Sequence, residues 1–160
     1  MKWIYSRGGP LILMANDLLP YWDGGAGGDY WRACDVTDWL GVLDVGSGQA
    51  LVVTGGPMET AHWLQGDCWL LVRWSCAPDE AAVTRHLERV PRLEFPAQAL
   101  TVDFGSRSAV LFDSVASASR LEGEETLELE LPHQTCEICT LDWKANEETN
   151  LILHSFKPAR

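Results

Sequence analysis

The chain has 160 residues, 46% of them hydrophobic, and these values exclude a disordered chain and are typical of one folded domain. Its 23 acidic and 12 basic residues give a formal net charge of −11, which disfavours binding to nucleic acid or anionic lipid. The longest apolar run near the N-terminus, residues 11–15, is too short for a secretory signal or a membrane span. We therefore expect a cytoplasmic protein with a single domain over residues 1–160. Because many proteins are acidic for solubility alone, the charge excludes a nucleic-acid binder more firmly than it identifies a partner.

The first structural signal along the chain is the turn sequence Gly8-Gly9-Pro10, which separates two apolar strips. Glycine tolerates a positive φ and proline restricts the residue before it, so this tripeptide predicts a tight change of direction. A phosphate-binding loop would instead lead into a helix N-terminus and would carry a lysine at a fixed spacing. Here the turn leads into the strand-like residues 10–13 without such a lysine. We expect a structural corner.

The next two segments predict a short helix and a hairpin. Residues 28–40 are ambiguous, and we expect them to hold a short helix capped by Asp29. Residues 41–55 predict a β-hairpin, because two apolar arms flank the glycine-rich bend at 46–48.

A central strand and one clear helix follow. Residues 68–74 form a continuous apolar run that is typical of a strand covered on both faces. Arg73 is the one charge in this run, and it needs a carboxylate or carbonyl partner if it is buried. Residues 79–90 predict a helix, because acidic residues stand at its start, apolar residues recur at helical spacing and Pro91 ends it.

The remainder of the chain predicts strands. Residues 99–113 predict a second hairpin that turns at Gly105-Ser106. Residues 126–132 alternate leucine with acidic residues, so one face is expected to be buried and the other solvated. Residues 150–156 predict a last strand. The expected fold class is therefore α+β, mostly antiparallel β-sheet with one clear helix near residues 79–90.

Five cysteines in a chain without a secretory signal predict reduced thiols. Cys136 and Cys139 have the spacing of a zinc knuckle or a redox dithiol, and His133 and His154 could in principle complete a metal site. A redox pair opens a helix, however, whereas the flanking residues predict a strand, on which residues three apart point to opposite faces. We expect small buried hydrophobic side chains, with no metal and no cofactor.

Signals for catalysis are sparse. The four histidines stand in unrelated sequence contexts, and no G-x-S-x-G motif is present. A pair formed by Cys34 and a histidine stays open as an alternative, because such residues meet in space rather than in sequence. Histidines in a β-rich core are more often structural, so we expect that the protein is not an enzyme.

The chain has eight tryptophans, which is many for this length. Trp69 and Trp74 belong to the expected central strand and are predicted to lie in the core. Three others flank the glycine-rich loop 23–29, where an interface role is plausible because binding hot spots are rich in tryptophan. With two aspartates of the loop they form the candidate partner-binding set: Trp22, Asp23, Asp29, Trp31 and Trp39.

Several blocks of the sequence occur together in an order that resembles one family. Residues 3–13, 18–22 and 29–34 are similar to the start of the immunity protein 21 family. The segments GVLDVGSGQALVVTGGPMETA, LLVRW and LILHSF are similar to its later blocks, so the resemblance covers almost the whole chain.

The resemblance implies a cytoplasmic protein of a bacterial polymorphic toxin system that binds and neutralises a cognate toxin domain, and it carries no catalytic residues. The bulk charge adds the hypothesis that an acidic surface helps to cover the active site of a basic toxin such as a nuclease. Two alternatives from other classes stay open. One is a small cytoplasmic enzyme that uses a Cys/His pair, and the other is a tryptophan-rich ligand-binding β domain.

Overall fold

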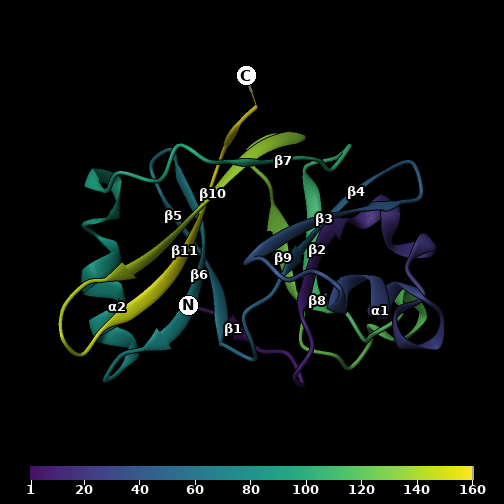
Figure 1. Cartoon of the computed structure of the whole chain (residues 1–160), viewed down its shortest axis with the longest axis horizontal. Helices are drawn as coiled ribbons and strands as arrows, with labels where there is room; N and C mark the ends of the chain where they lie inside the picture. The colour runs from purple at the N-terminus through teal and green to yellow at the C-terminus, as the bar shows by residue number, and fades with distance from the viewer. Residues whose placement is uncertain (160) are drawn as a thin grey trace.

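The computed structural model describes residues 1–159 and contains two antiparallel β-sheets that face each other, with helices on their outer sides (Figure 1). The six-stranded sheet has the order β1-β5-β6-β11-β10-β7, and the five-stranded sheet has the order β3-β4-β2-β8-β9. In chain order the strands are β1 Trp3–Ile4, β2 Leu11–Ala15, β3 Leu40–Val45, β4 Gly48–Val53, β5 Thr60–Gln65, β6 Cys68–Cys76, β7 Leu100–Asp103, β8 Ser108–Asp113, β9 Leu127–Glu130, β10 Thr135–Lys144 and β11 Asn150–Pro158. The α-helices are α1 Asp29–Cys34 and α2 Glu80–Leu87, and the 3-10 helices are η1 Asn16–Tyr21, η2 Gly24–Ala26, η3 Val90–Arg92 and η4 Ala118–Arg120.

Three apolar clusters hold these layers together, one between the sheets and one on the outer face of each sheet. Between the sheets, Leu13 of β2 packs in the same cluster as Leu71 of β6 and Ile138 of β10. Helix α2 covers the outer face of the six-stranded sheet through Val83 and Leu87. Helices α1 and η1 contribute to the cluster on the outer face of the five-stranded sheet. The two α-helices therefore lie on opposite sides of the molecule (Figure 1).

The elements with the strongest local signals are confirmed, and so is the α+β fold class. Helix α2 begins as predicted, because the Asp79 side chain accepts a hydrogen bond of 2.7 Å from the Ala82 N–H and caps the helix. Strand β6 lies in the interior of the six-stranded sheet, as expected for a continuous apolar run. Strands β3 and β4 form the predicted hairpin, with Gly46 in its turn at a φ of 57°.

The predicted strands of the C-terminal third are confirmed as well. In β9 the leucines are buried and Glu128 and Glu130 are exposed, as the alternation predicts. Strand β11 is buried along most of its length between β6 and β10. Cys136 and Cys139 lie on β10, so their flanking residues form a strand rather than a helix. Both cysteines are buried. Burial raises the pKa of the Cys136 thiol.

Two predictions about local structure are wrong. Residues 99–113 do not form a hairpin, because β7 pairs with β10 in one sheet while β8 pairs with β2 and β9 in the other. Gly105 and Ser106 thus lie in a connection between the sheets rather than in a hairpin turn. Asp29 is the first residue of α1 and not its cap; Gly28 occupies the cap position without a side-chain hydrogen bond.

The turn at Gly8-Gly9-Pro10 is a corner between the two sheets, as predicted. It connects β1 of the six-stranded sheet to β2 of the five-stranded sheet. Gly8 has a φ of 125°, which disfavours any residue with a side chain. A Cβ at Gly9 would lie 2.7 Å from Cε2 of Tyr30, so this position needs glycine for a different, steric reason.

The described helices are short. No helix within residues 1–159 combines the length and the hydropathy that crossing a membrane requires.

Candidate partner-binding surface

Three exposed aromatic rings lie on α1 and at the two ends of the edge strand β3: Trp31 is on α1, Trp39 precedes β3, and Tyr21 lies against Gly46 in the turn after β3. We call the surface made by Tyr21, Asp23, Asp29, Trp31 and Trp39 the α1 face. The side chains of Tyr21 and Trp31 are each 63% exposed, and that of Trp39 is 40% exposed. Large aromatic rings at such exposure lose water-accessible area on binding and are the commonest anchors of protein interfaces.

Helix α1 is held against the edge strand β3 by one buried contact and one bridging arginine. Ala33 is buried in the cluster on the outer face of the five-stranded sheet. Arg32 donates one hydrogen bond of 2.9 Å to the carbonyl oxygen of Asp44 in β3 and forms an ion pair of 2.8 Å with Asp29. These contacts fix the helix, and with it Trp31, beside the open edge of the sheet.

The glycine-rich loop 23–29 is closed by its two terminal aspartates. The Asp23 N–H donates to the Asp29 carboxylate at 3.0 Å, and the Asp29 N–H donates to the Asp23 carboxylate at 3.3 Å. A Cβ at Gly27 would overlap the Asp23 carboxylate, which explains glycine at that position. Both aspartates therefore keep the loop in shape. Asp23 is exposed, whereas the Asp29 side chain is only 14% exposed and its charge is paired with Arg32.

Trp22 does not lie on this surface. Its side chain is 2% exposed and packs in the cluster under the five-stranded sheet, where its indole N–H donates to the carbonyl oxygen of Ser114 at 3.1 Å. The side chain of Trp22 is therefore not accessible to a partner. Its neighbour Tyr21 is the exposed residue of the pair, and the sequence contains no periodic pattern that would have told the two apart, because the 3-10 helix η1 ends there.

Trp39 forms the wall of a hollow next to the start of β3. Its ring lies against Gly55, where a Cβ would collide with it, and the Thr54 N–H donates to the Trp39 carbonyl oxygen at 3.0 Å. The hollow is open and has a volume of about 410 Å³. Its lining is formed by Val36, Thr37, Asp38, Trp39, Thr54 and Gly55.

Arg73 lies close to Gly55, where a Cβ would be 3.2 Å from its Nη1, and is 1% exposed. As predicted, its partner is a carbonyl: Nη2 donates to the Gly56 oxygen at 2.7 Å, and Nε donates to the Thr60 hydroxyl at 3.4 Å. Its Nη1 has no hydrogen-bond partner in the described residues. Burial lowers the pKa of Arg73 to about 10, because the charged form is poorly solvated there.

The catalytic alternative of a Cys/His pair finds no support in these contacts. Cys34 is exposed on α1 and interacts with Tyr30, and this hydrogen bond raises the pKa of the Tyr30 hydroxyl. His154 is bonded to Thr140 and His86 to Asn146, and no hydrogen bond joins Cys34 to a histidine within residues 1–159. In the same range, no group of three or more His, Cys, Asp or Glu residues could hold a metal ion.

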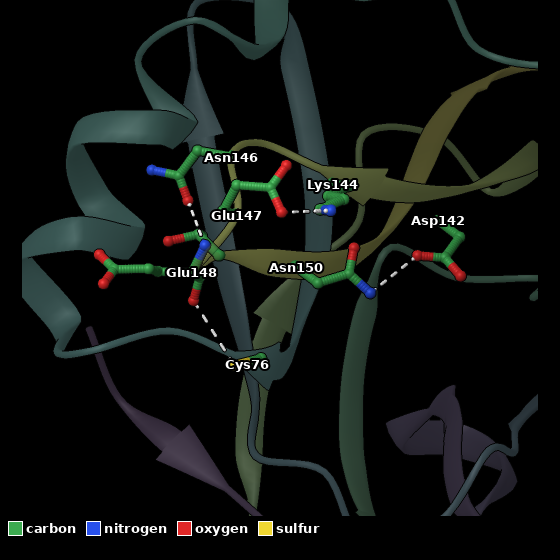
Figure 2. Close-up of a pocket in the computed structure, with 8 residues that line it drawn as sticks. Cys76, Asp142, Lys144, Asn146, Glu147, Glu148 and Asn150 are labelled. Atoms are coloured by element: carbon green, nitrogen blue, oxygen red, sulfur yellow. Dashed lines mark hydrogen bonds and ion pairs between the residues drawn. The ribbon is translucent and has the colours of Figure 1, made fainter.

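A second hollow, of about 530 Å³, lies where the β10–β11 hairpin passes the end of β6 (Figure 2). Several of its polar groups are already paired with one another. Asn150 donates to Asp142 at 3.0 Å, Lys144 pairs with Glu147 at 3.0 Å, and the Cys76 thiol donates to the Glu148 carbonyl oxygen. The side chains of Glu147 and Glu148 point in different directions in Figure 2, so the acidic residues do not converge on one point.

Comparison with known families assigns the chain to a class. A family model described as immunity protein 21 matches residues 2–149. The match assigns the chain to the immunity proteins, a class whose members are typically non-enzymatic and neutralise toxins. The chain belongs to the immunity protein 21 family. No curated protein and no solved structure matches it.

Proposed function

We propose that the protein neutralises a cognate toxin domain by covering the toxin's active site with the α1 face. The observation that carries this proposal is the exposure of Trp31 on α1 and of Trp39 and Tyr21 at the two ends of the neighbouring strand β3. Rigid aromatic rings offer large contact area at a low cost in side-chain entropy. Each ring is also held in place, since Trp31 packs edge-on against Tyr30 at 5.1 Å, Trp39 lies against Gly55 and Tyr21 lies against Gly46.

The charge around the α1 face favours a basic partner. Residues 16–44 contain six aspartates and only one basic residue, Arg32. Such a local field speeds the encounter with a positively charged protein and repels acidic ones. A nuclease domain, whose own substrate is a polyanion, has the required basic character. We therefore propose a basic nuclease-type toxin domain as the partner.

The same proposal includes the cytoplasm as the site of action and one domain over the whole chain. All five cysteines are free thiols, which fits a reducing compartment. The clusters on both outer faces and between the sheets share strands, so the two sheets depend on each other for burial.

The test is co-expression with the toxin domain encoded beside the gene, followed by purification of the complex and assay of the toxin. We expect a stable complex in which toxin activity is lost, and competition between the immunity protein and the toxin's substrate. The double variant Trp31→Ala/Trp39→Ala should bind at least about tenfold more weakly. Tyr5→Ala is the matched control, because Tyr5 is an exposed aromatic residue outside the α1 face.

Two results would count against the proposal. A bound toxin that keeps its activity would exclude coverage of the active site. A tryptophan double variant that binds as well as the Tyr5→Ala control would place the interface elsewhere.

A further inference from the structure

A groove runs along the free edge of β9, on the side of the molecule where the five-stranded sheet meets the β5–β6 hairpin and the end of β11. Its volume is about 610 Å³. Within residues 1–159, strand β9 is the last strand of its sheet and pairs only with β8. The groove is separate from the α1 face, which lies at the opposite edge strand, β3, of the same sheet.

The backbone of β9 directs unpaired groups into this groove. The Leu131 N–H donates to the Arg107 carbonyl oxygen at 2.8 Å, so odd-numbered residues of this segment turn their main-chain groups toward β8. The even-numbered residues Glu128 and Glu130 therefore turn theirs outward. The Glu130 carbonyl oxygen is taken by the indole N–H of Trp69 at 3.0 Å. The N–H and C=O of Glu128 and the N–H of Glu130 are available to another strand.

The base of the groove is apolar, apart from one polar atom of His62. Trp69 is buried beneath His62, with the two ring centres 4.4 Å apart. The His62 Nε2 atom is buried and has no hydrogen-bond partner in the described residues, and burial lowers the pKa of this imidazole. Leu64 on the rim is 57% exposed, which is high for a leucine beside an apolar floor. An apolar side chain of a bound segment would pack against these residues.

The charges on β9 decide which kind of strand fits. Glu128 and Glu130 are both exposed on the outer side of the strand. Arg107 lies 3.4 Å from the Glu130 carboxylate, and Lys157 also lines the groove. Pairing β9 with β9 of a second copy would set these glutamates against each other, and like charges in neighbouring strands destabilise a sheet. Lysine or arginine at the same positions would pair favourably with them. The edge therefore favours a basic strand of another protein over self-association.

We propose that an extended segment of the cognate toxin, with alternating basic and apolar residues, adds to β9 as a further strand of the five-stranded sheet. Its basic residues lie opposite Glu128 and Glu130 on the outer face, and its apolar residues cover His62 and Leu64 in the groove. Main-chain hydrogen bonds to Glu128 hold the segment, and the alternating side chains set its register. This inference rests on the proposed function for the identity of the partner, and it adds a second contact site.

The direct test uses a defined probe, the capped hexapeptide Lys-Val-Lys-Val-Lys-Val, titrated against the protein by calorimetry and by amide chemical shifts. In an antiparallel pair, residues that exchange hydrogen bonds share a face, so the lysine amides of the probe face Glu128. N-methylation of those amides removes the donors and keeps the charge. We expect the unmethylated peptide to bind at least tenfold more tightly and to shift the Glu128 amide most.

The matched protein variants carry the same change in net charge at two places. Glu128→Lys/Glu130→Lys should lower the affinity for the peptide at least tenfold, whereas Glu147→Lys/Glu148→Lys, on the distant β10–β11 hairpin, should change it less than twofold. If both double variants lose the same affinity for the peptide, the effect is one of net charge and the proposal is wrong. If the methylated peptide binds as tightly as the unmethylated one, main-chain hydrogen bonds do not hold it and the proposal is wrong as well. Sedimentation could also overturn the proposal. If the wild-type protein is a dimer and Glu128→Pro makes it a monomer, the edge of β9 pairs with a second copy of the chain.

Failure of this inference can be distinguished from failure of the proposed function. If wild-type protein binds the toxin and the β9 double variant binds equally well, the strand addition is wrong and the neutralising function stands. If wild-type protein does not bind the toxin at all, the function is wrong, and the peptide titration still reports on the groove.

Discussion

The indole N–H of Trp69 donates a hydrogen bond of 3.0 Å to the carbonyl oxygen of Glu130 and so joins the two sheets. Trp69 belongs to β6 in the six-stranded sheet, and Glu130 ends β9 in the five-stranded sheet. Because the Glu130 carbonyl faces the free edge of β9, this bond also occupies part of the edge and fixes one end of the groove beside it.

Replacing Trp69 with phenylalanine removes this bond and leaves a small void. We expect Trp69→Phe to lower the free energy of unfolding by about 1–3 kcal/mol, since the partly buried Glu130 carbonyl loses its donor and the smaller ring packs less well. Urea denaturation followed by circular dichroism measures the change. Trp31→Phe is the control, because an exposed ring should change stability by less than about 0.5 kcal/mol. Equal stability of the two variants would show that the bond does not hold the sheets together.

His154 should make the protein less stable in mild acid. Its side chain is fully buried and bonded to the Thr140 hydroxyl at 2.9 Å, and burial and the nearby Arg73 charge lower its pKa to about 3. The unfolded chain takes up a proton near pH 6.5 and the folded chain does not, so stability falls as the pH falls from 6.5 towards 3. The slope from this residue is at most about 1.4 kcal/mol per pH unit.

The variant His154→Gln tests this assignment, because glutamine does not titrate. Urea unfolding at several pH values between 4 and 7 should give a shallower slope for the variant than for the wild type. A part of the slope should persist, because burial also lowers the pKa of His62. Identical slopes would mean that His154 is not the residue responsible.

The two glycines at the corner should respond differently to the same substitution. Gly9→Ala places a methyl group against the Tyr30 ring, whereas Gly8→Ala strains a backbone with a φ of 125° in open space. Each should cost about 1 kcal/mol of stability. In a Tyr30→Ala background the cost at Gly9 should largely disappear and the cost at Gly8 should not. A double-mutant cycle by urea unfolding measures both, and coupling at Gly8 as strong as at Gly9 would contradict this explanation.

The sequence predicts those parts of the fold that local signals specify. Helix α2 is recognisable because its cap, Asp79, and its apolar residues at helical spacing lie within the segment itself, but it ends at Leu87, before the predicted end, and Pro91 lies in η3. Residues 99–113 predict a hairpin because Gly105 is a typical turn residue, yet β7 and β8 join different sheets through partners far along the chain. The Phe104 N–H donates to the Gln134 carbonyl oxygen, and the Leu131 N–H donates to the Arg107 carbonyl oxygen. Neither hydrogen bond can be predicted from the local sequence pattern.

The candidate surface is predictable only in part for the same reason. The sequence places aromatic residues around loop 23–29, and Trp31 and Trp39 are indeed exposed. Which member of the pair Tyr21 and Trp22 turns inward depends on how η1 sits on the five-stranded sheet. The groove at β9 depends on which strand forms the edge, and strand order is a property of the whole fold.

The thiols should differ in reactivity according to burial. Cys34 and Cys76 are exposed, whereas Cys136 and Cys139 are buried. We expect the first two to react quickly with a maleimide in native protein and all five to react in denaturant, as read by mass spectrometry. Protein purified without added metal should contain no stoichiometric zinc. Rapid native labelling of Cys136, whose pKa is raised by burial, would contradict the packing of β10.

Association and dissociation of the toxin should depend on different residues of the α1 face. Asp23→Asn/Asp29→Asn keeps the acceptors that close the loop and removes two charges, so it should slow association at low salt. Raising the ionic strength from 0.01 M to 0.15 M shortens the Debye length from about 30 Å to about 8 Å and should shrink the difference from wild type. Trp31→Ala should instead speed dissociation by about tenfold, because it removes a contact formed only in the complex.

Stopped-flow mixing at several salt concentrations separates the two rates. Glu147→Gln/Glu148→Gln is the matched control, since it removes two exposed charges from the β10–β11 hairpin, away from the α1 face. This control should slow association less than the aspartate pair, because steering depends on charges close to the docking site. If both pairs slow association equally, the net charge of −11 guides the toxin without a preferred face. If the association rate does not depend on salt at all, electrostatic steering does not contribute to binding. The aromatic rings alone then have to account for recognition of the toxin.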